Sequence, residues 1–240
     1  MHKWLLITLL GVSTTLHAQA EFETDPKTGK KGLFDAGTYE RILPLVYDDV
    51  QSFRSIDSLI KVKVGAQWGL YTKKGRLIVP VRYDHIDLPK RALFKSYVSV
   101  EKNGLLGLYH CNGKEVLPPK FGDVQAIRPD VVMGRLPGDS LLQFYDDKGA
   151  FLFKAAGEVA LEGYDANTVE IMRVDQSRYF LDKTGKAVFP DHFVNARWTD
   201  GRSVICAYIA PGEITTSNAG LYKSDGTIVL PPFYARIKPA

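Results

Sequence analysis

The sequence predicts an all-β protein that is built from six repeated units. The stretch WGLYTKKGRLIVPVRYDHI (68–86) recurs along the chain at intervals of about 36–41 residues, a period typical of repeat architectures. Segments such as YVSVEKN (97–103) alternate apolar and polar residues, as half-buried strands do. Beyond the first 20 residues no segment shows the periodicity of a long helix.

The copies of this stretch differ in how much of the pattern they keep. LGLYHCNGKEVLPPKFGDV (106–124) and AGLYKSDGTIVLPPFYARI (219–237) keep the first Gly, the Leu-Tyr pair, the turn Gly and the Pro. RYFLDKTGKAVFPDHFVNA (178–196) has lost the first Gly, and GLFDAGTYERILPLVYDDV (32–50) has a turn of altered length. The weakest copy, LLQFYDDKGAFLFK (141–154), has Lys where the Pro is expected.

Each unit is expected to contain short antiparallel strands joined by tight turns. The turn before each of these glycines carries Lys, Asn or Asp, and such residues together with Gly supply the positive φ angles that tight hairpins need. Strands such as RLIVPV (76–81) are expected to end at Pro, which cannot donate to a central ladder and therefore suits the end of a strand or the edge of a sheet. Residues that recur in every unit cannot all form one catalytic group, so they indicate turn and core positions. These structural positions are Trp68, Gly69, Gly75, Pro80, Tyr83, Gly107, Gly113, Pro118, Gly185, Pro190, Gly220, Gly226 and Pro231.

The two ends of the chain suggest how the units are arranged. A unit of this size can supply four strands, so we expect a six-bladed β-propeller. The segment FYARIKP (233–239) matches the first strand of a further unit, whereas residues 21–35 begin at the second strand. Strands from both ends would then close the ring without an exposed edge. The alternative is an open stack of β-units.

The first 20 residues have the layout of a secretory signal peptide. A basic start, Met1-His2-Lys3, precedes the apolar run WLLITLLGV (4–12) and the small-x-small site Ala18-Gln19-Ala20. The apolar run is shorter than the roughly 20 residues that span a membrane. We therefore expect cleavage after Ala20, a single six-unit domain over residues 21–240 without a membrane span, and export to the periplasm or the cell exterior.

Composition indicates a globular chain and makes nucleic acid an unlikely partner class. The chain is 45% hydrophobic and 24% charged. Its net charge of +4, from 31 basic and 27 acidic residues, is too mild to predict a nucleic-acid partner. Cys111 is expected in a turn and Cys206 in a strand, either paired or as two unrelated thiols.

The units resemble the WG-repeat (KWG-repeat) family of bacterial proteins. Units of that family run kWGliD-x-x-Gk-x-viP-x-x-Yd-x-I, and only the copy at Trp68-Gly69 keeps the Trp-Gly pair. The matching positions are Gln67-Trp68-Gly69-Leu70-Tyr71, Gly75, Val79-Pro80 and Tyr83-Asp84, with Gly107-Leu108-Tyr109, Gly113, Leu117-Pro118 and Phe121 in the next unit. The resemblance implies an exported or envelope-associated β-repeat protein and carries over no catalytic residues.

No catalytic or metal-binding pattern stands out, so neither a cofactor nor a metal is expected. His110 and Cys111 are adjacent, which places them on opposite faces of a strand, and no zinc-ligand spacing occurs. The acids outside the repeat pattern form no recognisable pair; they are Glu158, Glu162, Glu170 and Asp200. We expect no enzyme. The alternative is a hydrolase of envelope glycans on a propeller scaffold, which would bring two carboxylates together in a pocket.

Binding is the function that the sequence favours, through the variable connections between units. In residues 195–202, Trp198 lies close to Arg197, Asp200 and Arg202, a composition typical of binding hot spots and sugar-stacking platforms. Packing of Trp198 under its own loop is the alternative. A second connection carries Lys90 and Arg91. We therefore expect a non-enzymatic binding or scaffold module whose partner is a protein or a cell-envelope glycan.

Overall fold

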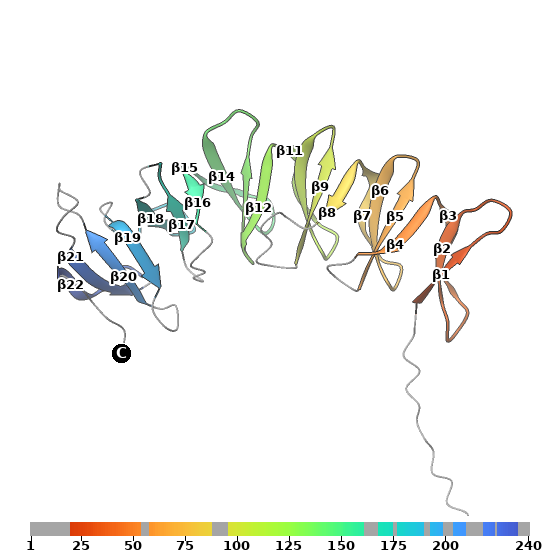
Figure 1. Cartoon of the computed structure of the whole chain (residues 1–240), viewed down its shortest axis with the longest axis horizontal. Coiled ribbons are helices and arrows are strands. Elements are labelled where there is room, and N and C mark those ends of the chain that lie inside the picture. Colours follow the sequence, from red (N-terminus) through yellow and green to blue (C-terminus); the bar gives the residue numbers. More distant parts are fainter. Residues whose placement is uncertain are drawn as a thin grey trace, which may run out of the picture.

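The all-β prediction is confirmed. A computed structural model describes residues 20–53, 58–87, 96–160, 168–174, 177–189, 193–198, 204–209, 218–223 and 225–234, and these residues form strands and turns but no helix. The strands make six small antiparallel sheets that follow one another along the chain and lie side by side in a row (Figure 1). None of the described residues belongs to a helix long and apolar enough to cross a bilayer.

The first three sheets are formed by residues 20–121. The first sheet contains β1 (Ala20–Thr24), β2 (Lys31–Asp35) and β3 (Arg41–Tyr47). The second contains β4 (Asp49–Ser52), β5 (Leu59–Val64), β6 (Gln67–Thr72) and β7 (Leu77–Tyr83). The third contains β8 (His85–Asp87), β9 (Tyr97–Lys102), β10 (Leu105–His110) and β11 (Glu115–Phe121).

The remaining three sheets follow the same order. The fourth contains β12 (Asp123–Arg128), β13 (Val131–Arg135), β14 (Leu141–Asp146) and β15 (Phe151–Ala156). The fifth contains β16 (Glu158–Val159), β17 (Val169–Met172) and β18 (Arg178–Leu181). The sixth contains β19 (Phe193–Trp198), β20 (Val204–Ile209), β21 (Asn218–Lys223) and β22 (Ile228–Tyr234).

The turn glycines have the predicted role, and they also pack against the neighbouring sheet. Gly75 and Gly149 have φ angles of 79° and 84°, a region that favours glycine. A Cβ on Gly149 would lie 2.4 Å from the carbonyl oxygen of Val116 in the preceding sheet. Glycine is therefore needed at this turn both for its backbone conformation and for the close approach of two sheets.

The prediction that strands end at the template proline is wrong. Pro80 lies inside β7, which continues to Tyr83, and Pro118 lies inside β11 in the same way. Both strands occupy the outer position of their sheets, where no further strand needs an N–H donor from the proline. The register shifts between Trp68 and Leu70, where β6 pairs with β7, so the ladder is irregular opposite this proline.

The hydrophobic core lies between neighbouring sheets. Leu33, Leu43 and Tyr47 of the first sheet pack with Ile60 and Val62 of the second, and all five are buried. A similar cluster joins the second sheet to the third, and others follow along the row. Each sheet thus buries its apolar residues against its neighbours, as in repeat proteins generally.

Closure of the row into a six-bladed ring is not confirmed. Within the described part of the chain, β1 pairs only with β2, and Ile228–Tyr234 pairs with β21. The first and the sixth sheets lie at opposite ends of the row (Figure 1). Of residues 233–239, which were expected to complete the first sheet, Phe233 and Tyr234 belong to β22 and the others lie outside the described residues. Residues 1–19 of the expected signal peptide also lie outside them. Ala20, the expected cleavage position, is the first residue of β1.

A candidate binding pocket between the fourth and fifth sheets

Aromatic pairs join most neighbouring sheets. One partner is the residue that ends the last strand of a sheet, and the other lies four residues before the next turn glycine. The rings meet edge to face, with centroid distances of 6.1 Å for Tyr47–Tyr71 and 5.8 Å for Tyr83–Tyr109. Phe121 and Tyr145 repeat the arrangement at 5.8 Å between the third and fourth sheets. Such pairs stabilise a contact beyond the area that they bury.

Both aromatic positions have changed where the fourth sheet meets the fifth. Gly157 stands where Tyr83 and Phe121 stand in their units, and Leu181 takes the position of Tyr109. A Cβ on Gly157 would lie 2.5 Å from the carbonyl oxygen of Met172, so a larger residue does not fit this backbone. This junction therefore lacks the edge-to-face aromatic pair that joins the preceding sheets.

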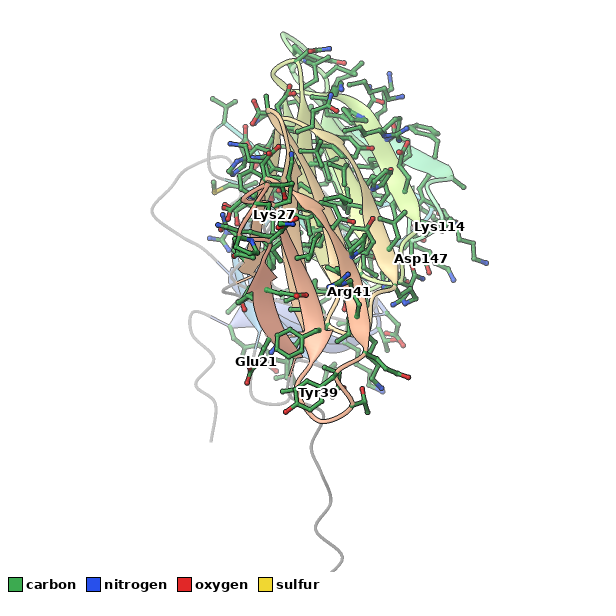
Figure 2. The ribbon with its side chains drawn as sticks, turned by 90° about the vertical axis from the view of Figure 1, so that its right-hand side faces the viewer. Glu21, Lys27, Tyr39, Arg41, Lys114 and Asp147 are labelled. Carbon is green, nitrogen blue, oxygen red and sulfur yellow. The ribbon has the colours of Figure 1, made fainter. Side chains whose placement is uncertain are left out.

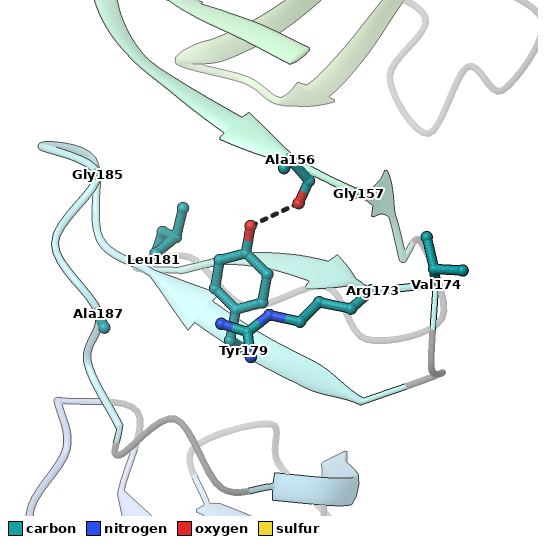
Figure 3. A pocket seen from close by; sticks show the side chains of 8 residues that line it. All are labelled: Ala156, Gly157, Arg173, Val174, Tyr179, Leu181, Gly185 and Ala187. Carbon is teal, nitrogen blue, oxygen red and sulfur yellow. Dashed lines mark hydrogen bonds between the residues drawn. The ribbon is translucent and has the colours of Figure 1, made fainter. Parts of the chain in front are cut away.

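A pocket of about 410 Å³ lies at this junction. It is lined by Ala156, Gly157, Arg173, Val174, Tyr179, Leu181, Gly185 and Ala187 (Figure 3). Its volume falls in the range of small-ligand sites, roughly 300–1,000 Å³. Its lining is mostly apolar, with a few polar groups placed at one side, which is the usual composition of a binding pocket.

The polar groups of the pocket come from Tyr179 and Arg173. The Tyr179 hydroxyl donates a hydrogen bond of 2.7 Å to the Ala156 carbonyl oxygen, which ties the fifth sheet to the fourth (Figure 3). The Arg173 guanidinium lies 4.7 Å from the centroid of the Tyr179 ring, a cation–π contact. A guanidinium held in this way keeps its planar fork of donors, which suits a carboxylate.

The described acids near this pocket face basic partners. Glu158 accepts from Arg135 at 2.6 Å, and the buried Glu170 accepts from Arg178 at 2.7 Å. Glu162 and Asp200 lie outside the described residues. Across the described ranges, no three His, Cys, Asp or Glu side chains come together in a metal-binding group.

A polar cluster between the second and third sheets has a structural role. The hydroxyls of Tyr83 and Tyr109 lie 2.8 Å apart, and Glu115 accepts from Tyr109 and from Arg82. Burial first, and then the hydrogen bond with Glu115, raises the pKa of Tyr109 above its usual range. The hydroxyl therefore stays protonated at neutral pH and acts as a hydrogen-bond donor that holds the two sheets together.

The described residues do not test the binding hot spot proposed from sequence, which stays a prediction. Arg197 and Trp198 lie in β19, opposite Cys206 and Ile205, so the prediction that they belong to a loop is wrong. Lys90, Arg91, Asp200 and Arg202 lie outside the described residues, as does the structural position Pro190. Cys111 lies in the turn after β10, as expected, and Cys206 lies in a strand of the sixth sheet.

Sequence reasoning missed Arg173 and Tyr179. Tyr179 stands in the copy at 178–196, at the position of the lost first Gly, and Arg173 precedes that copy; neither lies in a segment that was singled out as a variable connection. The available signal was the absence of an aromatic residue at Gly157 and at Leu181. An alignment of all six copies that extends to the position of Tyr83 and Phe121 shows this absence.

Comparison with protein families gives one match. Residues 68–105 match the family described as the WG containing repeat. This segment of the chain is a WG repeat. The matched WG repeat runs from Trp68 in the second sheet to Leu105 in the third, so it includes the junction between two sheets as well as their strands.

Solved structures of low sequence identity also resemble this chain. A crystal structure of the eukaryotic initiation factor matches with a TM-score of 0.40 and 8% identity, covering 91% of this chain and 67% of that one. KlHsv2 with loop 6CD replaced by a Gly-Ser linker gives 0.35 and 9%, covering 87% and 81%. A protein of unknown function from Bacteroides caccae gives 0.28 and 11%, covering 89% and 93%. A search of curated proteins gave no match.

Proposed function

We propose that this protein is an exported, non-enzymatic binding module, and that the pocket between the fourth and fifth sheets binds a protein partner. The observation that carries the proposal is that Gly157 and Leu181 stand where other units have the two aromatic residues of the junction. Beside them, the Arg173 guanidinium stacks on the Tyr179 ring. The pocket is suited to an extended segment that presents a carboxylate to Arg173 and an apolar side chain to Val174 and Leu181.

The chemistry of the pocket supports binding over hydrolysis. The lining residues that the structure describes include no carboxylate, imidazole or thiol. The Tyr179 hydroxyl already donates to the Ala156 carbonyl oxygen, and Glu158 and Glu170 are held by their own arginines. A glycan hydrolase would need two carboxylates converging on one pocket.

We propose further that the open row is the working form of the protein. Register places Glu21 opposite Phe34 and Glu23 opposite Gly32 in the first sheet. The equivalent positions in the second sheet are the buried Ile60 and Val62, which pack against the preceding sheet. A first unit with glutamates on this face has the polar outer surface of a terminal capping repeat, which supports the open stack over a closed ring.

The proposal is tested by capture of partners from cell envelopes with the tagged full-length chain. Arg173→Gln removes the charge, and Leu181→Trp fills the pocket from the other side. The matched control is Lys74→Gln, which removes an exposed positive charge on a distant turn. We expect one protein to be captured by the wild type and the control and lost with both pocket variants. Capture of the same proteins by all four chains would contradict the proposal.

A further inference from the structure

The outer face of the first sheet carries an exposed aromatic site. This face looks away from the other five sheets (Figure 2). A second pocket of about 370 Å³ lies here, lined by Glu23, Phe34, Tyr39 and Arg41. The register aligns β2 with both neighbours, because Phe34 pairs with Glu21 on β1 and with Arg41 on β3. The four lining residues therefore come from adjacent positions of one sheet and its turn.

Tyr39 occupies a left-handed backbone position for which another turn of the first sheet uses glycine. Its N–H donates to the Asp35 carbonyl four residues earlier, as the N–H of Gly29 donates to the Asp25 carbonyl. The φ angle of Tyr39 is 59°, in the left-handed region that is unfavourable for a bulky residue. A strained conformation of this kind persists where the surroundings or a function maintains it.

Packing does not explain why a tyrosine is kept at this strained position. Its side chain is 82% exposed, and the ring contact described for it is with Phe34. The two rings are nearly parallel, with an angle of 16° between their planes and 6.5 Å between their centroids. They present two aromatic faces in similar orientations at the end of the row.

Charged groups border the two rings. The Arg41 Nη2 atom donates to both carboxylate oxygens of Glu23, at 3.3 Å and 3.0 Å. This pair is solvent-accessible and holds a planar donor group and a planar acceptor group at the edge of the aromatic pocket. Hydroxyl groups of a ligand can donate to the carboxylate and accept from the guanidinium.

We infer that this outer face binds a neutral pyranose unit of a glycan. The C–H face of a sugar ring is apolar and stacks on an aromatic face, while its hydroxyl groups point outward toward polar partners. A protein partner would require about 800 Å² of complementary surface on this side. Two rings bordered by one ion pair suit a single sugar unit better. The inference does not depend on the pocket between the fourth and fifth sheets.

The test measures the binding of two neutral oligosaccharides, tri-N-acetylchitotriose and maltotriose, to the full-length chain by saturation-transfer NMR and calorimetry. Tyr39→Gly introduces the residue type that another turn of the first sheet uses at this position, so we expect an equal or higher melting temperature together with at least a tenfold loss of affinity. Arg41→Gln should weaken binding without removing the stacking.

Two controls make the result specific. Phe151→Ala deletes an aromatic side chain of the fourth sheet that is 54% exposed, and it should leave glycan affinity unchanged. Arg173→Gln should also leave it unchanged, which separates this inference from the proposed function. A wild type that binds neither oligosaccharide, or a folded Tyr39→Gly variant that binds as the wild type does, would overturn the inference.

Discussion

Replacing Phe121 by alanine should uncouple the third sheet from the fourth. Phe121 ends β11, is completely buried and meets Tyr145 edge to face at 5.8 Å. Gly134 lies directly against it, since a Cβ on that glycine would be 2.6 Å from the Phe121 ring. The ring therefore fills the space between two sheets, and no flexible side chain in these contacts is positioned to take its place.

The expected cost follows from the size of the group removed. Truncation of a buried Phe to Ala costs about 3–5 kcal/mol. About 0.5–1.5 kcal/mol of this belongs to the lost aromatic pair. With a urea m-value of about 2–3 kcal/mol/M, the midpoint of unfolding should fall by about 1–2 M. Phe22→Ala removes the same group from a position that is 50% exposed, and should cost less than about 1 kcal/mol.

Urea unfolding followed by circular dichroism measures the cost, and hydrogen exchange shows where it is felt. In an open row each sheet contacts only its neighbours, so exchange should accelerate in the third and fourth sheets and stay unchanged in the first. A loss of less than about 1 kcal/mol would refute the role given to the aromatic pair. Equal acceleration in all six sheets would refute the open row.

Two further predictions concern a turn and a buried hydroxyl. Gly149→Ala should destabilise the chain by at least about 1 kcal/mol more than Gly65→Ala. Both glycines have positive φ, but only Gly149 has a backbone atom, the Val116 oxygen, within 4 Å of the added Cβ. Equal urea midpoints for the two variants would count against the close approach. The buried Tyr97 hydroxyl donates to the Pro129 carbonyl at 2.7 Å, and burial raises its pKa from 10.0 to about 12. Because the folded-state pKa is the higher one, its contribution is complete below pH 10 and is lost as the pH rises to about 12. Tyr97→Phe should therefore lower the free energy of unfolding by about 1 kcal/mol at pH 7, as measured by urea unfolding. The same measurement at each pH should show a smaller fall in stability between pH 10 and about 12 than in the wild type. An unchanged fall in stability over this range would speak against the pKa shift.

The contacts between neighbouring sheets explain why the turn glycine and the two aromatic positions recur from unit to unit. The turn glycine lets one sheet approach the backbone of the sheet before it, and the aromatic four residues earlier meets the closing aromatic of that same sheet. The pattern thus records contacts between units more than contacts within a unit. A change at one position, such as Gly157, alters the junction and leaves the strands on either side intact.

The sequence by itself determined the all-β class, the number of units and the structural role of the recurring residues. It could do so because strand alternation, turn glycines such as Gly75 and the spacing of the units are local or repeated properties. The same local reasoning placed Pro80 at a strand end, where the structure continues β7 to Tyr83. A proline is tolerated there because β7 lies at the edge of its sheet, and edge position is a property of the whole sheet.

Only the tertiary structure decided the arrangement of the units and the position of the two pockets. Gly157 and Leu181 are unremarkable in sequence, and they leave a pocket because the packing of two sheets brings their positions to the same junction. The strand register places Glu21 and Glu23 at the positions that Ile60 and Val62 occupy in the second sheet. Ile60 and Val62 are buried against the first sheet, whereas Glu21 and Glu23 make the outer face of the first sheet polar. Periodicity specifies each strand, whereas the volume and polarity of side chains at the junctions determine how the sheets pack and where a ligand has room to bind.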